Sequence, residues 1–541
     1  MHFRGVHGGA AKGRDRGSIG SVGDSLDNAS MESGIGNLEH RTPTPAGVHQ
    51  SREAQPSPLC PFGRQPWPSL CAIVAAKFAR TRIRYLCENW SASTRPSPGE
   101  PSATIKLSKR HEQKFSSALR TLHIHKVAEV GMLLAKVVRS LLHTGTLTIV
   151  DVGGRPHRIQ GAAPGPEVTI RIHDRSTAWR LVLHPRLAVG EAYMNGTLTV
   201  DGERLYDFLD LLGRNMSAIE RSWWLAWSLR LQRSVRRLQQ RNPIGRVQRN
   251  VAHHYDINDA LYELFLDRDR QYSCAYFLHP DASLEVAQAA KKRHILAKLR
   301  IDAQHKVLDI GSGWGGLGLY IARETGADVT GVTLSRDQHA IATQRAATAG
   351  EGARVRFKLQ DYRLETERYD RIVSVGMFEH VGVGHYDEYF GKVRDLLTDD
   401  GVMLLHAIGR MQPPCGTNPW MRKYIFPGAY IPALSEVLAS IERAGLWVTD
   451  IEILRLHYAE TLQHWRRRFM QNREEVKRLT GLDDRFCRMW DFYLAGSEMS
   501  FRHMHEMVFQ LQLAKRVDSV PITRDYMYEG ERARDLPLLS Q

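Results

Sequence analysis

The alternation of apolar and polar positions divides the chain into four parts. Residues 1–131 are rich in Gly, Ser, Pro and His and show little periodicity, as is typical of disordered segments. Residues 132–215 mix helical stretches with strand-like alternation such as "TLTIVDVGG" and predict a small α+β domain. A basic helical linker follows over 216–260, and residues 261–530 form the largest part.

The boundary between the first two parts has two interpretations. Met132 opens "MLLAKVVRSLL", the first stretch with helical periodicity, and looks like the beginning of a domain. The extension before it is therefore either a tail or the result of a start codon assigned too far upstream.

Buried strand runs and helical stretches alternate through the largest part. The strand runs are "KVLDIGSG", "ADVTGVTLS", "VRFKLQD", "YDRIVSVGMFEH" and "GVMLLHAIG". Strands separated by helices predict an α/β fold with a doubly wound, mostly parallel sheet. Such sheets bind ligands at the carboxyl ends of their strands, so the residues that end these runs are the first candidates for a functional site.

The turn after the first of these strands carries Gly311, Gly313 and Gly316, the spacing of a dinucleotide-binding turn. Asp309 precedes them by two positions, where that fingerprint normally has an apolar residue. The second strand ends as "GVTLS", without a carboxylate for a ribose hydroxyl, while Asp361 closes the third strand. These features argue against a nicotinamide. They favour S-adenosylmethionine, which needs close backbone approach and has no pyrophosphate, and they are typical of a class I methyltransferase.

The composition adds a strongly basic charge, with a formal net charge of +15 and a pI near 9.6. Residues 1–131 hold 18 Lys and Arg against 10 acidic residues, so +8 of this excess lies there. Such a balance favours anionic partners, either nucleic acid or an acidic membrane surface. No run of 18 apolar residues occurs, so we expect no membrane-spanning helix. Six cysteines without paired spacing predict neither a zinc site nor a disulfide framework and suit a reducing cytosol.

The linker concentrates part of this charge. Eight arginines and no acid lie from Arg221 to Arg249, with Trp223, Trp224 and Trp227 at the start. On an amphipathic helix this combination suits the headgroup region of an anionic bilayer, or else bases stacked on the tryptophans. The plainer alternative is a solvated basic face. We favour the membrane because of the chemistry that the largest part suggests.

Five motifs carry a resemblance to the cyclopropane-fatty-acyl-phospholipid synthases and the mycolic-acid cyclopropane synthases. They are "HHYDINDALYELFLD", "QYSCAYF", "SVGMFEHVG", "LLHAIG" and "HYAETLQHW". The resemblance runs from about residue 132 to about residue 530. It implies a seven-stranded class I methyltransferase sheet and a reaction in which a cis alkene of an acyl chain attacks the sulfonium methyl. A base then removes a proton from the new methyl, so that a cyclopropane ring closes.

The family is understood to use a bound bicarbonate as that base, because a carboxylate side chain pressed against the cation could be alkylated. By resemblance, five residues hold it, with Ile408 offering its backbone and Glu379 and His406 forming a hydrogen-bonded pair. The five are Cys274, Glu379, His406, Ile408 and Tyr458. Taken singly, a buried cysteine or histidine is more often an ordinary core residue, so the assignment depends on their joint presence.

The same resemblance assigns twelve residues to S-adenosylmethionine, from its sulfonium end through the methionine part and the ribose to the adenine. They are Tyr272, Ser273, Asp309, Gly311, Gly313, Trp314, Thr333, Leu334, Gln338, Asp361, Tyr362 and Arg363. Thr333 stands where many methyltransferases have an acid, so contact with the ribose is expected to be weaker there or mediated by water.

The sequence thus predicts a cyclopropane-fatty-acyl-phospholipid synthase that uses S-adenosylmethionine and bicarbonate, without a metal or a nucleic-acid partner. We expect it in the cytoplasm, at the inner face of the cell membrane, with phospholipid acyl chains drawn from an anionic surface. The small domain would help to dock on the lipid, and a homodimer is compatible with this arrangement. Three alternatives stay open: a lipid methyltransferase that stops before ring closure, an N-methyltransferase of small amines, and a lipid-binding module without catalysis.

Overall fold

The computed structural model describes residues 131–217 and 259–533. The predicted disorder of the N-terminal extension and the predicted Trp/Arg membrane helix concern residues outside these ranges. Within them, no helix is long and apolar enough to cross a membrane.

The first described unit contains a four-stranded sheet in the order β2-β1-β3-β4. Its elements after a helical stretch at 131–141 are β1 (Thr144–Val150), β2 (Pro156–Gln160), β3 (Ala163–Ile172), α4 (Arg175–Leu183), α5 (Pro185–Met194), β4 (Leu198–Val200) and α6 (Leu205–Arg214). Alternate residues of β1, such as Leu147 and Ile149, are buried in one apolar cluster with residues of α6. The period of two in the sequence therefore corresponds to one covered face of this sheet.

The second unit is built on a seven-stranded sheet in the order β10-β11-β9-β8-β5-β6-β7. The strands are β5 (Lys306–Ile310), β6 (Asp328–Thr333), β7 (Val355–Leu359), β8 (Tyr369–Val375), β9 (Leu397–Arg410), β10 (Trp447–Ile453) and β11 (Glu506–Ala514). All neighbours from β7 to β9 pair in parallel, whereas β11 pairs antiparallel with both β9 and β10. The predicted α/β fold with a mostly parallel seven-stranded sheet is confirmed.

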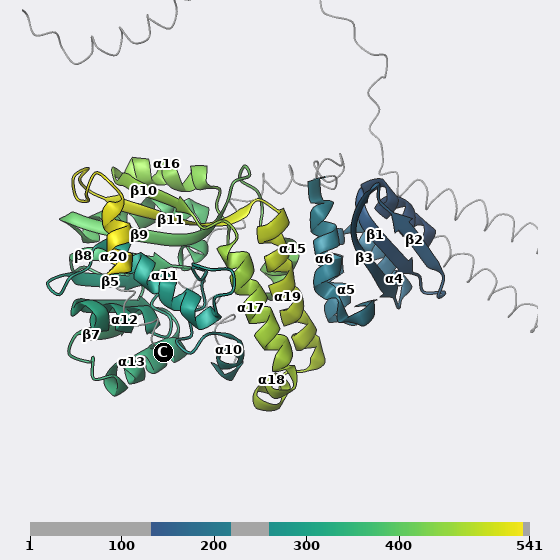
Figure 1. Cartoon of the computed structure of the whole chain (residues 1–541), viewed down its shortest axis with the longest axis horizontal. Coiled ribbons are helices and arrows are strands. Elements are labelled where there is room, and N and C mark those ends of the chain that lie inside the picture. The colour runs from purple at the N-terminus through teal and green to yellow at the C-terminus, as the bar shows by residue number, and fades with distance from the viewer. Residues whose placement is uncertain (1–130, 218–258, 534–541) are drawn as a thin grey trace, which may run out of the picture. The chain divides into compact units, whose positions relative to one another are not determined.

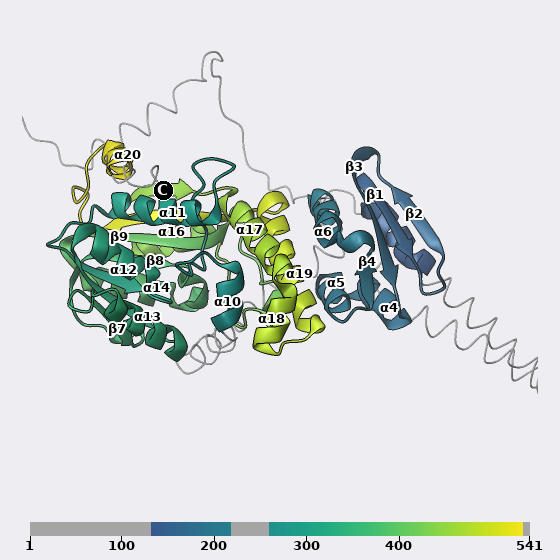
Figure 2. The same ribbon diagram turned by 60° about the horizontal axis from the view of Figure 1, so that its bottom comes forward.

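Helices cover both faces of this sheet (Figures 1 and 2). Val307 of β5 packs in a cluster with α11 (Leu284–Leu299) and α12 (Gly316–Thr325), while the next residue, Leu308, packs in a cluster with α14 (Tyr386–Leu396) and α16 (Leu434–Ala444). Because successive side chains of a strand point to opposite faces, both faces are apolar and the strands read as continuous apolar runs. The helix α13 (Arg336–Thr348) connects β6 to β7.

A group of helices outside the sheet forms a third, aromatic-rich cluster. They are α10 (Asp259–Phe265), α15 (Pro419–Tyr424), α17 (His457–Gln471), α18 (Arg473–Thr480) and α19 (Asp484–His503), and α20 (Asp525–Arg532) ends the described chain. Both views show α17 and α19 side by side (Figures 1 and 2). Trp465 and Trp490, one from each of these two helices, are fully buried in the cluster.

The strand order changes direction at β5. From β5 the chain continues through β6 and β7 on one side, and then returns to place β8 on the other side. The connections after β5 and β8 therefore leave the sheet in opposite directions, and a crevice forms between them at the carboxyl edge. The glycine turn after β5 lies at this point.

Candidate active site

The turn after β5 brings the backbone close to the crevice. Gly311 has φ of +87° and Gly313 has φ of +53°, a region that favours glycine. A Cβ atom at Gly311 would lie 2.7 Å from Cβ of Met377, so any larger residue would clash there. A Cβ atom at Gly313 would meet no atom within 4 Å, which leaves open space above the backbone. The helix α12 begins only three residues later, at Gly316.

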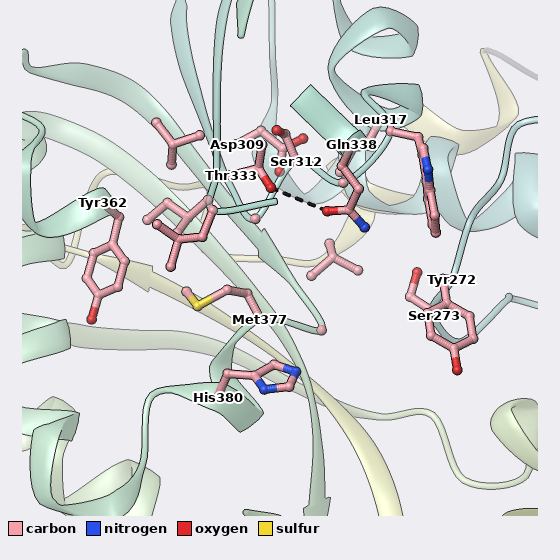
Figure 3. A pocket seen from close by; sticks show the side chains of 18 of the residues that line it. Tyr272, Ser273, Asp309, Ser312, Leu317, Thr333, Gln338, Tyr362, Met377 and His380 are labelled. Carbon is pink, nitrogen blue, oxygen red and sulfur yellow. Dashed lines mark hydrogen bonds between the residues drawn. The ribbon is translucent and has the colours of Figure 1, made fainter. Parts of the chain in front are cut away.

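A cavity opens beside this turn (Figure 3), and all twelve residues predicted to bind the cofactor line it. The residues that line it and that the sequence did not point out include Gln271, Ser312, Gln360, Met377 and His380. In the close view, Tyr272 and Ser273 stand on one side and Tyr362 on the other, with Met377 and His380 between them. Because Met377 and His380 follow the end of β8, the strand pattern of the sequence could have placed them at the carboxyl edge of the sheet.

The segments at the ends of the second and third strands are held by hydrogen bonds between residues close in the sequence. The Thr333 hydroxyl donates to Oε1 of Gln338 across 3.3 Å. The Asp361 carboxylate accepts from the Arg363 guanidinium at 2.9 and 2.7 Å and from its backbone amide at 3.0 Å. Asp361 therefore holds Arg363 in place beside Tyr362, and much of its hydrogen-bonding capacity is used within the protein.

Asp309 differs from these paired groups. It is buried at the end of β5, and its Oδ2 atom has no hydrogen-bond partner among the described residues. Burial raises the pKa of its carboxyl to about 7, and the positive charge of Lys291 opposes this rise. A cationic ligand in the cavity would compensate the charge of this carboxylate.

The five residues predicted to hold bicarbonate do not line this cavity. Cys274 and Tyr458 belong to the aromatic-rich cluster, and Ile408 packs against it. The carboxylate of Glu379 accepts a hydrogen bond from the backbone amide of Ile408 across 2.6 Å. Burial raises the pKa of the Cys274 thiol, which therefore remains protonated. Cys274 follows Ser273 directly, and Glu379 lies between Met377 and His380, so this group adjoins the cavity through its neighbours in the chain.

The predicted hydrogen bond between Glu379 and His406 is wrong. Nδ1 of His406 is 3.1 Å from the side-chain nitrogen of Gln510, which lies opposite it on β11. Nε2 of His406 and Oε2 of Glu379 are both buried without a partner among the described residues. The backbone amide of Ile408 is thus the partner of Glu379 in place of His406. The cross-strand neighbour Gln510 is the partner of His406 in place of Glu379.

Burial shifts both of these groups towards their neutral forms. The pKa of the Glu379 carboxyl rises to about 7, although backbone hydrogen bonds oppose the rise. The pKa of the His406 imidazole falls to about 3, and the charges of Lys291 and Lys298 act in the same direction. At neutral pH the structure therefore presents a neutral imidazole and a carboxyl group that titrates close to the working pH.

Lys291 of α11 is a polar group that the sequence did not point out. It is fully buried, and its Nζ donates to Oε1 of Gln271 and to Oγ of Ser273, each at 2.8 Å. One turn earlier, Gln288 donates to the carbonyl oxygens of Gln271 and Ser273. The helix thereby fixes the segment that forms one wall of the cavity. Thirteen of its sixteen residues are buried, so the usual alternation of apolar and polar faces gave no signal for Lys291.

Comparison with known proteins agrees with this geometry. The family model "Mycolic acid cyclopropane synthetase" matches residues 244–511. A "Probable fatty acid methyltransferase" of Pseudomonas putida is 35% identical over 379 residues, which are 68% of this chain and 92% of that protein. The cyclopropane-fatty-acyl-phospholipid synthase of Escherichia coli is 35% identical over 361 residues, which are 67% of this chain and 91% of the relative.

The fold also has a counterpart among the solved structures. Coclaurine N-methyltransferase bound to N-methylheliamine and SAH superposes with a TM-score of 0.50 at 21% identity, and the match covers 60% of this chain and 99% of that one. The sheet and the glycine turn define a class I, S-adenosylmethionine-dependent methyltransferase. Within that class, the chain belongs to the cyclopropane synthase family, whose members modify lipid acyl chains.

Proposed function

We propose that this protein is a cyclopropane-fatty-acyl-phospholipid synthase, which transfers the methyl carbon of S-adenosylmethionine to a cis double bond of a phospholipid acyl chain. One observation carries the proposal. The Glu379 carboxylate accepts a hydrogen bond from the backbone amide of Ile408, which packs against an apolar cluster that contains Cys274 and Tyr458, and its second oxygen has no partner among the described residues. A small polar group placed within apolar surroundings suits a reaction that must exclude water.

The residues of the cavity fit S-adenosylmethionine. Gly313 leaves open space over the turn, and Asp309 offers a buried carboxylate to the α-ammonium group. Thr333 at the end of the second strand and Gln338 in the helix that follows it would lie beside a ribose, and Tyr362 would present its ring to an adenine. When bound, S-adenosylmethionine would supply an activated methyl group on its sulfonium, and Tyr272 and Ser273 would hold that end of the cofactor.

The second group of residues would hold a bicarbonate that acts as the base. The thiol of Cys274 and the hydroxyl of Tyr458 are neutral donors, and the Ile408 amide already donates to Glu379. Nε2 of His406 has no partner among the described residues, and because the imidazole is neutral it can exchange a hydrogen bond with the bicarbonate without adding charge. The proton removed from the new methyl would pass to the bicarbonate oxygen, and the electron pair of that C–H bond would close the ring.

A second candidate function is methyl transfer to the same alkene without ring closure. The similarity to the fatty acid methyltransferase of Pseudomonas putida favours it, because that relative is as similar to this chain as the Escherichia coli synthase. The complete set of Cys274, Glu379, His406, Ile408 and Tyr458 favours ring closure instead, since a cation resolved by another route would not need a bound base.

We further propose that the substrate is taken from an anionic membrane surface at the inner face of the cell membrane. The eight arginines and three tryptophans of the linker support this proposal through their composition alone.

The deciding experiment uses purified protein, S-adenosylmethionine and vesicles of a cis-monounsaturated phospholipid. Proton NMR of the recovered acyl chains should show the upfield signal of a cyclopropane methylene. A chain that gains one carbon and keeps an alkene signal would support the second candidate. Unchanged lipid would refute both candidates and would direct the search to small amines.

A further inference from the structure

Lys291 is a buried cation that donates to Ser273, one of the residues that line the cavity. Its nearest polar partners, Gln271 and Ser273, are both uncharged, and it forms no ion pair with any described residue. Burial lowers the pKa of its ammonium group to about 8, the charge of Lys292 acts in the same direction, and the charges of Asp267 and Asp269 oppose the shift. A buried charge without a close counter-ion is costly, which indicates that an anion belongs near it.

The direction of the hydrogen bonds shows where that anion would bind. An ammonium group can only donate, so Oγ of Ser273 accepts from Lys291. The hydroxyl hydrogen of Ser273 is then available to a different acceptor, and no described residue accepts it. Ser273 lines the cavity, and Figure 3 shows it beside Tyr272 at the edge of the open space. The hydroxyl is therefore a donor towards the cavity, polarised by the positive charge behind it.

A group of opposite charge, Asp309, also lines the cavity. It is buried, its Oδ2 has no partner among the described residues, and its charge interacts with that of Lys291. A buried cation and a buried anion beside one cavity complement a ligand that carries both charges on adjacent atoms. The α-amino acid end of S-adenosylmethionine is such a zwitterion.

We propose that Lys291 is a positioning residue that orients and polarises the Ser273 hydroxyl as the hydrogen-bond donor to the α-carboxylate of S-adenosylmethionine. The inference rests on the proposed binding of this cofactor and adds the means by which its amino acid end is recognised. Lys291 acts through Ser273 and has no contact of its own with the reacting atoms.

The test compares two ligands that differ only in the carboxylate. They are S-adenosylhomocysteine and its decarboxylated analogue, 5′-(3-aminopropylthio)-5′-deoxyadenosine, and calorimetry measures the Kd of each. The native protein should prefer the carboxylated ligand roughly ten- to hundredfold, as expected for a hydrogen bond to a charged group. Lys291→Met should remove most of this preference while leaving the Kd of the decarboxylated ligand within about threefold.

Ser273→Ala is the second variant, because it leaves the buried lysine in place and changes only one surface of the cavity. It should remove the same preference, and the double variant should lose no more than either single one. Lys298→Met is the matched control. Lys298 is also buried on α11, but it pairs with Glu452, so its replacement should leave the preference intact.

The outcomes separate the inference from the function on which it rests. A preference that survives in both Lys291→Met and Ser273→Ala would overturn the inference. An equal loss of affinity for both ligands would also overturn it, because it would show a merely structural role. A native protein that binds neither ligand would overturn the proposed function itself, and the inference with it.

Discussion

The cavity at the end of β5 and the buried group around Glu379 contain residues that are neighbours in the chain, but their polar side chains differ in how many hydrogen-bond partners they have. In the cavity, Asp361 is paired with Arg363 and Thr333 with Gln338. In the buried group, Glu379 and His406 each keep one buried atom without a partner among the described residues. Leaving a buried polar atom unpaired costs about 1–3 kcal/mol, so a protein retains it only where something is gained.

The difference indicates that the two groups of residues serve two tasks, cofactor binding and the positioning of a base. Binding a large cofactor requires a wall of fixed shape, which paired side chains provide before the ligand arrives. Holding a small base beside a cationic transition state requires polar atoms whose capacity is still unused. Two residues of the cavity are exceptions, because the hydroxyl of Ser312 and Oδ2 of Asp309 are also buried without a partner among the described residues, and of the two only Asp309 is ionisable. Asp309 is therefore the residue of the cavity at which we expect a charged group of the ligand to bind.

The largest effect is expected from Glu379→Gln, which keeps the shape of the side chain and removes its negative charge. Turnover should fall roughly 10²- to 10⁴-fold, because the variant no longer positions the base. The Kd of S-adenosylhomocysteine should stay within a few-fold, since Glu379 does not line the cavity. Single-turnover kinetics together with calorimetry check both values. A loss confined to cofactor affinity would place Glu379 in the cofactor site, so that the two groups of residues would serve the same task.

The same variant should change how stability depends on pH. Between about pH 4.5 and pH 7 the Glu379 carboxyl is protonated in the folded state and ionised in the unfolded state, because its pKa is raised to about 7 in the fold. The folded state then binds more protons, so its stability falls as the pH rises through this window and levels off above it.

Glu379→Gln removes this contribution. The variant should therefore exceed the native protein in stability at pH 8 by an amount on the order of 3 kcal/mol, with a much smaller difference near pH 4.5. Urea unfolding at both pH values measures the effect, and Glu474→Gln, at an exposed side chain, is the control. Parallel pH profiles for the native protein and Glu379→Gln would show that Glu379 ionises normally.

Asp309→Asn should reduce cofactor affinity and leave turnover at saturation almost unchanged. It should weaken the binding of S-adenosylhomocysteine roughly ten- to hundredfold, because a charge-assisted hydrogen bond to the α-ammonium is lost. At saturating S-adenosylmethionine, turnover should remain within a few-fold of the native value. Titration of the cofactor in steady-state assays separates the two quantities. A large fall in turnover at saturation would mean that Asp309 serves the chemistry as well.

The smallest effect is expected from Thr333→Val. Its hydroxyl already donates to Gln338, so its contribution to a ribose contact is indirect. We expect cofactor affinity to fall about two- to tenfold, in line with the loss of one neutral hydrogen bond. Equilibrium binding measures this, and a loss as large as that of Asp309→Asn would show that Thr333 contacts the ribose directly.

Much of this architecture follows from local sequence patterns. The apolar runs of the strands, which are buried on both faces, and the glycines of the turn after β5 predict the parallel sheet and the edge at which a ligand binds. This works because side-chain period and backbone conformation depend on near neighbours in the chain. Ten of the twelve residues of the cofactor prediction line one cavity because they lie at or after the ends of β5, β6 and β7, whereas Tyr272 and Ser273 reach it from the segment before α11. Their assignment to the cofactor stays a prediction.

Which buried polar atoms have hydrogen-bond partners depends on the tertiary structure. Sequence reasoning paired Glu379 with His406, whereas the fold gives Glu379 the amide of Ile408 and gives His406 the side chain of Gln510 on β11. It also buries Lys291 behind Ser273, on a helix whose residues are mostly hidden from solvent. Hydrogen-bond partners and buried charges depend on segments that come together only when helices and strands pack. The sequence alone therefore does not predict them.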